Sequence, residues 1–135
     1  MRDRGQGGIV VMSSGAAIAG SALIATYSAT KAYQQILCEA LWAELDGTGV
    51  DVVCVMAGST ATPAFLRTTA VGADDPSVMD PAVVATNALA ALGNGPVVGA
   101  SDELTRTFAG LYTDPGTMLV DGVSAGTRAT FGLDG

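Results

Sequence analysis

Apolar residues along the chain gather into continuous runs and helix-spaced patterns that predict an α/β protein. Residues 8–12 and 50–56 are runs of mostly β-branched residues, which we expect to form buried parallel strands. Residues 27–45 carry apolar positions at helical spacing and end at a glycine-containing turn, so they predict a long helix. A strand, a helix and a strand joined by short links predict a right-handed parallel crossover.

The second half of the chain predicts a third strand between helices. Residues 60–78 have no clear periodicity, and we expect a mobile loop there. Asp80 and Pro81 are typical of a helix N-cap and first turn, and that helix is expected to end at Gly93. Its expected apolar residues are Val84, Ala88, Leu89 and Leu92. Residues 96–99 are expected to form the third, short strand.

Two further helices are predicted after the third strand. Ser101 or Asp102 is expected to cap the first, and a short helix is expected after Pro115, before a loose Gly/Thr-rich end. The apolar residues expected along the first of these helices are Leu104, Phe108, Leu111 and Tyr112. No internal repeat or linker interrupts the chain, so residues 1–135 are expected to form a single domain.

Composition narrows the classes of function. The 135 residues carry a formal net charge of −7 and a pI near 4.1, which argues against nucleic acid or an anionic membrane as a partner. Histidine is absent, which excludes Ser-His-Asp catalysis and most zinc sites, and no metal site is predicted. Cys38 and Cys54 are expected to be buried as small apolar side chains, as in a cytoplasmic protein. The longest apolar run, residues 16–25, is too short to span a bilayer.

Tyr27 and Lys31 are the most informative pair in the sequence. They lie four residues apart on a predicted helix, so they project from the same face, and Lys31 is the only lysine. A lysine charge beside a phenol favours the phenolate, which makes the tyrosine a usable proton donor and acceptor near neutral pH. The alternative is an ordinary tyrosine at a helix start and a solvated surface lysine.

Together with two other segments, this pair resembles the catalytic half of the short-chain dehydrogenase/reductase family. Ser14 lies thirteen residues before Tyr27, the spacing at which family members carry the serine that holds the substrate oxygen. Residues 57–62, Ala-Gly-Ser-Thr-Ala-Thr, resemble the family's Pro-Gly-x-x-x-Thr segment beside the nicotinamide, with alanine in place of the proline. The resemblance covers residues 7–99 well.

The resemblance implies a fold, a cofactor and roles for named residues. The implied fold is part of a doubly wound, Rossmann-like parallel sheet with flanking helices. The implied reaction is hydride exchange between NAD or NADP and a small-molecule carbonyl or secondary alcohol. Ser14, Tyr27 and Lys31 would be catalytic, and Lys31 would also bind the nicotinamide ribose. The residues expected to border the cofactor are Tyr27, Lys31, Gly58, Thr60 and Thr62.

Apolar residues near these positions suggest a substrate pocket. Those expected to line it are Ile18, Leu23, Ile24, Phe65 and Leu66. They favour a small or medium-sized apolar ketone or alcohol as the substrate. An ordinary core beneath a loop explains the same residues equally well.

The family's other half has no counterpart in the sequence. Its dinucleotide site is a Gly-rich turn after the first strand, and no such motif is present in the 135 residues. Residues 1–7 resemble the helix end and turn that precede the fifth strand of full-length relatives. We therefore expect a C-terminal half with weak or no activity alone. It would be completed by an N-terminal half supplied separately, or paired with a second copy through the helix at residues 27–45. The residues expected to supply that pairing face are Tyr33, Leu37, Leu41 and Trp42.

Two other interpretations compete with a dehydrogenase. A non-catalytic remnant or interaction module would keep the dimer-forming helix and have no cofactor site. A hydrolase that uses Ser14 is disfavoured, because the chain has no histidine base and no other base at a suitable spacing.

We predict that the 135-residue chain alone binds NADH and NADPH weakly. Backbone N–H groups of a Gly-rich turn and a helix N-terminus normally hold the pyrophosphate, and the sequence has no such turn. A fluorescence titration of each cofactor with the purified chain measures this. Dissociation constants well above about 1 micromolar are expected, and binding at or below that value would contradict the prediction.

Overall fold

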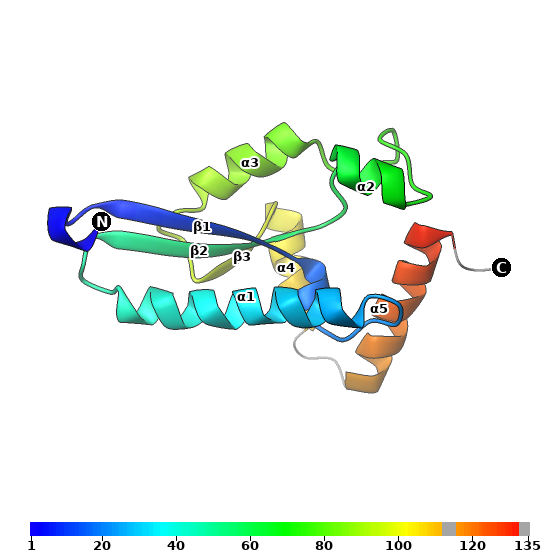
Figure 1. Ribbon diagram of the computed structural model, residues 1–135, viewed down its shortest axis with the longest axis horizontal. Coiled ribbons are helices and arrows are strands. Elements are labelled where there is room, and N and C mark those ends of the chain that lie inside the picture. The colour runs from blue at the N-terminus through cyan, green and yellow to red at the C-terminus, as the bar shows by residue number, and fades with distance from the viewer. Residues whose placement is uncertain (112–115, 133–135) are drawn as a thin grey trace.

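The computed structural model describes residues 1–111 and 116–132 of the chain. Its centre is a parallel sheet of the strands β1 (Gly7–Ser14), β2 (Val50–Ala57) and β3 (Val97–Gly99), in the order β1-β2-β3 (Figure 1). These are the strands that the sequence predicts. The expected partial, doubly wound parallel sheet is therefore confirmed.

Helices cover both faces of this sheet. α1 (Ala25–Glu44) runs along one face and α3 (Pro81–Ala90) lies on the other (Figure 1). The remaining helices are η1 (Arg2–Arg4), η2 (Gly15–Ala17), α2 (Pro63–Thr68), α4 (Asp102–Leu111) and α5 (Gly116–Phe131). Figure 1 shows α2 and α5 beyond the carboxyl ends of β1 and β2. Among the described residues, none of the helices combines the length and the apolar character that crossing a bilayer requires.

The core divides at β2, whose side chains alternate between the two faces of the sheet. Val53 and Val55 are fully buried in the cluster beneath α3. Val52 and Cys54 are buried on the opposite face, where they pack with Cys38 of α1. Burial on both faces explains why residues 52–57 of β2 are a continuous apolar run, and the predicted burial of both cysteines is confirmed.

Side-chain caps start the helices on either side of β3. Asp80 Oδ1 accepts a hydrogen bond from the Ala82 N–H at 2.6 Å, which confirms the predicted start of α3. Ser101 Oγ accepts a hydrogen bond from the Leu104 N–H at 3.2 Å, so Ser101 rather than Asp102 caps α4.

Two predictions about the segment between β2 and β3 are wrong. Residues 60–78 are not entirely loop, because Thr62 Oγ1 accepts a hydrogen bond from the Phe65 N–H at 3.2 Å and caps α2. The helix α3 ends at Ala90 rather than at Gly93, since a glycine is only one of several ways to stop a helix. The expected apolar position Leu89 is 65% exposed on α3.

The C-terminal prediction is also wrong. The sequence predicts a short helix and a loose end, whereas α5 spans 16 residues. Its glycines and threonines have low helix propensity, so tertiary contacts outweigh propensity here. The predicted positions Tyr112 and Pro115 lie outside the described residues.

The helix α4 rests directly on the end of β3. The Gly99 N–H donates a hydrogen bond to Thr105 Oγ1 at 2.9 Å, and a Cβ at position 99 would overlap the backbone nitrogen of Thr105. Glycine therefore permits this close approach. The contact holds α4 beside the carboxyl end of the sheet, next to the predicted site.

The buried thiols predict a loss of stability at high pH. Burial raises the pKa of the Cys54 thiol from 9.0 to about 12, and burial also raises the pKa of Cys38. Between these pH values the unfolded chain releases the Cys54 proton while the folded chain keeps it. The folded state therefore loses stability as the pH rises, by up to about 1.4 kcal/mol per pH unit for Cys54.

Urea denaturation from about pH 8 to pH 11 measures this loss, with Cys54→Ala as the comparison. Because the Cys38 and Cys54 thiols interact, the difference between the two proteins in the slope of unfolding free energy against pH reports the buried thiol pair rather than Cys54 alone. The free energy of unfolding is expected to fall less steeply with pH for Cys54→Ala than for the parent protein. Parallel slopes for the two proteins would show that the thiol titrates alike in the folded and unfolded states.

Candidate active site

Parallel pairing of β1 and β2 brings the predicted site residues to one edge of the sheet. Ser14, the last residue of β1, is aligned with Ala57, the last residue of β2. The carboxyl ends of parallel strands meet at the same edge, so the loops after both strands open there. The strand β1 continues to Ser14 rather than ending at Met12, which sets this serine at the rim of the sheet.

The two adjacent serines at the end of β1 have different partners. Ser13 is buried, and its Oγ donates a hydrogen bond to the Lys31 carbonyl at 2.9 Å. Ser14 Oγ accepts a hydrogen bond from the Ala16 N–H at 3.2 Å and caps η2. Because this hydroxyl acts as an acceptor in that contact, its own hydrogen remains available to a ligand.

Lys31 packs against Tyr27 within α1. Lys31 Nζ lies 5.6 Å from the centroid of the Tyr27 ring and donates a hydrogen bond to the Met12 carbonyl of β1 at 2.9 Å. The bond from Ser13 holds the main chain of the same lysine. Two contacts with β1 therefore fix the helical turn that carries Tyr27, whose side chain is 47% exposed.

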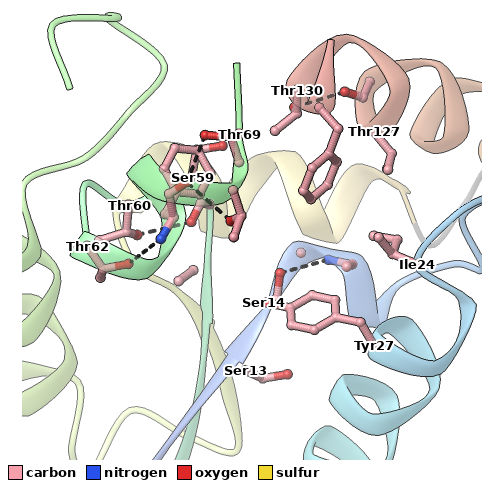
Figure 2. A pocket seen from close by; sticks show the side chains of 18 of the residues that line it. Ser13, Ser14, Ile24, Tyr27, Ser59, Thr60, Thr62, Thr69, Thr127 and Thr130 are labelled. Atoms are coloured by element: carbon pink, nitrogen blue, oxygen red, sulfur yellow. Dashed lines mark hydrogen bonds between the residues drawn. The ribbon is translucent and has the colours of Figure 1, made fainter. Parts of the chain in front are cut away.

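Ser14 and Tyr27 face a cavity of about 750 Å³ at this edge of the sheet. Figure 2 shows them on one side, with two further groups of labelled hydroxyl residues around them. The second group is Ser59, Thr60, Thr62 and Thr69, and the third is Thr127 and Thr130. Apolar side chains that complete the lining include Ile24, Phe65, Leu104, Phe108 and Phe131. The volume is within the range of small-molecule sites.

The segment after β2 forms the second wall of the cavity. Thr60 Oγ1 donates a hydrogen bond to the Gly58 carbonyl at 3.1 Å, and Thr62 caps α2. Residue 60 also forms a parallel β-bridge with Met79, which holds the turn against the segment before α3. These contacts make the wall a rigid turn, and Gly58, Thr60 and Thr62 all line the cavity.

Most of the predicted site residues gather around this cavity. Those that line it are Ser14, Ile24, Tyr27, Gly58, Thr60, Thr62 and Phe65. Ile18, Leu23, Lys31 and Leu66 are not among the lining residues. Leu23 is 64% exposed with a φ of 70°, and Leu66 is 38% exposed. Lys31 adjoins the site through its contact with Tyr27.

Sequence reasoning missed the third wall of the cavity, which α5 supplies. Ser21 Oγ lies 2.6 Å from Thr127 Oγ1, and the Ala22 N–H donates a hydrogen bond to Ser124 Oγ at 3.0 Å. A backbone hydrogen bond of 2.9 Å from Ala70 ties the other end of α5 to the segment after α2. The only signal in the sequence is a pair of hydroxyl residues one turn apart, which by itself identifies no partner.

A comparison with protein families matches the part of the chain that holds the first two walls. The model of the short chain dehydrogenase family matches residues 1–70, which include β1, α1, β2 and α2. No curated protein matches the chain.

Two solved structures are similar over most of the chain. One, from work on the stereoselectivity of a 7beta-hydroxysteroid dehydrogenase, has a TM-score of 0.77 and 25% identity, and the match covers 90% of this chain and 49% of that one. A short-chain dehydrogenase from Streptomyces avermitilis has a TM-score of 0.52 and 20% identity, and the match covers 81% of this chain and 47% of that one. At this identity the similarity shows the fold alone. The chain thus spans about half the length of these solved relatives.

Proposed function

The chain belongs to the short chain dehydrogenase family, and we propose that its cavity is the carbonyl-binding part of an oxidoreductase that works with NAD or NADP. The observation that carries this proposal is that Ser14 and Tyr27 face one cavity while Lys31 packs against Tyr27. Reduction of a carbonyl needs an oxygen-binding donor and a proton donor at the same group. The mostly apolar lining favours an apolar ketone or secondary alcohol.

Each residue of the proposed site has a separate task. Ser14 donates a hydrogen bond to the carbonyl oxygen, and Tyr27 transfers its proton to that oxygen as the double bond becomes single. A nicotinamide held beside Gly58 and Thr60 would supply the hydride that this reduction needs. Lys31 stabilises the phenolate that remains, and the exposure of Tyr27 allows solvent to return the proton. Alcohol oxidation reverses these steps.

The residues present fit the nicotinamide end of a cofactor. Gly58 and Thr60 line the cavity, and the Lys31 ammonium has two N–H donors beyond the one that it gives to Met12. Those donors suit a ribose hydroxyl. The sequence has no Gly-rich turn for the pyrophosphate, so we propose that the chain alone has weak or no activity. An N-terminal half supplied separately would complete the cofactor site beside the edge strand β1.

We predict that Ser14→Ala and Tyr27→Phe each weaken ketone binding by about five- to tenfold, because each removes one hydrogen bond to the carbonyl. An NMR titration with cyclohexanone labelled with ¹³C at the carbonyl measures the affinity without a cofactor. The carbonyl chemical shift of the bound ketone reports its hydrogen bonding. The bound shift should move toward that of the free ketone in both variants. Where excess NADPH or NADH supports turnover, Tyr27→Phe should lower kcat/KM by about 10²- to 10⁴-fold.

Tyr33→Phe is the matched control, because Tyr33 lies on the same helix, is 66% exposed and is not among the cavity-lining residues. It should leave the affinity and the shift unchanged. If Ser14→Ala and Tyr27→Phe behaved like this control, the two residues would not hold a carbonyl and the proposed function would be wrong.

A second proposal concerns the exposed apolar side chains of α1. Tyr33, Ile36 and Leu37 share one helical face, with Ile36 62% exposed, and Trp42 is 46% exposed. Leu41, expected on the same face, instead packs against the core. We propose that this face binds a second copy of the chain, either in a homo-oligomeric enzyme or, without catalysis, as an interaction module.

We predict that Ile36→Glu converts an associated form of the chain into monomer, because it buries a charge at the contact. Size-exclusion chromatography with light scattering measures the mass. Leu89→Glu is the matched control, since Leu89 is 65% exposed on α3, and it should leave the mass unchanged. A parent chain that is already monomeric, or equal dissociation by both variants, would rule out pairing through this face.

A further inference from the structure

The hydroxyl groups around the cavity differ in what they can offer a ligand. A hydroxyl has one hydrogen to donate and lone pairs that accept. One whose hydrogen is already given to a backbone carbonyl can only accept from a ligand. This distinction divides the cavity into a donating end and an accepting end.

The donating end is at β1 and α1. Ser14 Oγ accepts from the Ala16 N–H, so its hydrogen is available to a ligand, and the Tyr27 hydroxyl lies beside the same cavity. A carbonyl oxygen is an acceptor, so this end suits the reacting group of the substrate.

The accepting end is formed by Thr69, which directly follows α2, and by Thr130 of α5. Thr130 Oγ1 donates to the Gly126 carbonyl at 2.9 Å, and Thr69 Oγ1 donates to the Phe65 carbonyl at 2.9 Å. The backbone bond between residues 70 and 130 brings these two threonines to the same corner. Figure 2 places Thr130 across the cavity from Ser14 and Tyr27. A ligand group at this corner therefore meets oxygens that accept hydrogen bonds.

No charged side chain is among the residues that line the described cavity. The apolar residues of the lining include Phe65, Leu104, Phe108 and Phe131. A carboxylate or phosphate at the far end would leave water for a largely apolar wall, with no cation among the described lining residues and with oxygens that repel it. An uncharged group with a hydrogen to donate meets none of these costs.

We propose that the cavity binds an uncharged, largely apolar ketone or secondary alcohol that carries a further hydroxyl group at the end away from the reacting carbon. Thr130 accepts the hydrogen bond from that further hydroxyl. This rests on the proposed function, because Ser14 and Tyr27 set which end reacts. Helix α5 then selects the substrate, while the carbonyl chemistry stays with β1 and α1.

Three two-ring ketones that differ only at the far end test the proposal on the full 135-residue chain. They are 4-cyclohexylcyclohexanone, its 4′-hydroxy derivative and its 4′-carboxylate. Calorimetry or ligand-detected NMR measures the dissociation constant of each. The hydroxy ketone should bind about fivefold more tightly than the parent ketone, as expected for one added hydrogen bond, and the carboxylate should bind most weakly.

Two variants test whether Thr130 causes the tighter binding of the hydroxy ketone. Thr130→Val keeps the β-branched shape and should reduce the hydroxy ketone to the affinity of the parent ketone. Thr86→Val is the matched control: Thr86 also donates to the carbonyl four residues earlier, at 2.9 Å, and is not among the lining residues. Thr86→Val should leave the dissociation constants of all three ketones unchanged. Thermal melts of both variants show whether the fold is kept.

Failure of this inference and failure of the proposed function give different results. Equal binding of the parent and hydroxy ketones, tightest binding of the carboxylate, or a preference that survives Thr130→Val would overturn the inference. Ser14→Ala should weaken both neutral ketones equally and keep the preference between them. If Ser14→Ala changed neither affinity, the proposed function would be wrong. The assignment of the carbonyl end of the ligand to Ser14 and Tyr27 would then be wrong as well.

Discussion

The parallel pairing of β1 with β2 is the constraint on which the candidate site depends. Because Ser14 and Ala57 end their strands in register, the loops that follow both strands open at one edge of the sheet. Strand β1 also sets the position of α1 along the sheet, since Ser13 and Met12 hold the main chain and the side chain of Lys31. Strand β1 thus brings Ser14 to the helix that carries Tyr27 and Lys31, and its pairing with β2 sets them beside the segment after β2.

The features that could be predicted from sequence are those governed by local pattern. Residues 50–56 read as a buried strand because β2 is covered on both faces, and Asp80 marks a helix start because its carboxylate accepts from the first turn. Ser14, Tyr27 and the segment after β2 were predicted as site residues from their resemblance to the motifs of a known family, and the structure gathers them around one cavity. The strand and the helix start are local patterns, so a single sequence is enough to recognise them.

The parts that could not be predicted depend on partners far away in the chain. Helix α5 has few strong helix formers, and it is held by bonds such as Ser21 to Thr127, between residues 106 positions apart. The opposite error occurred at Leu23 and Leu66, which were expected to line the pocket but are 64% and 38% exposed and are not among the lining residues. Apolar character shows that a residue can line a pocket, whereas the path of the backbone decides whether it does.

The wall supplied by α4 and α5 lies downstream of residues 1–70, the part that matches the family model. The residues to which we assign proton transfer and the threonine of α5 to which we assign substrate choice therefore lie in separate stretches of the sequence. Substitutions in the downstream stretch can alter what the cavity accepts and leave the paired strands and the Tyr27–Lys31 contact intact. Such a division would let the accepted substrate change while the proposed reacting residues stay the same.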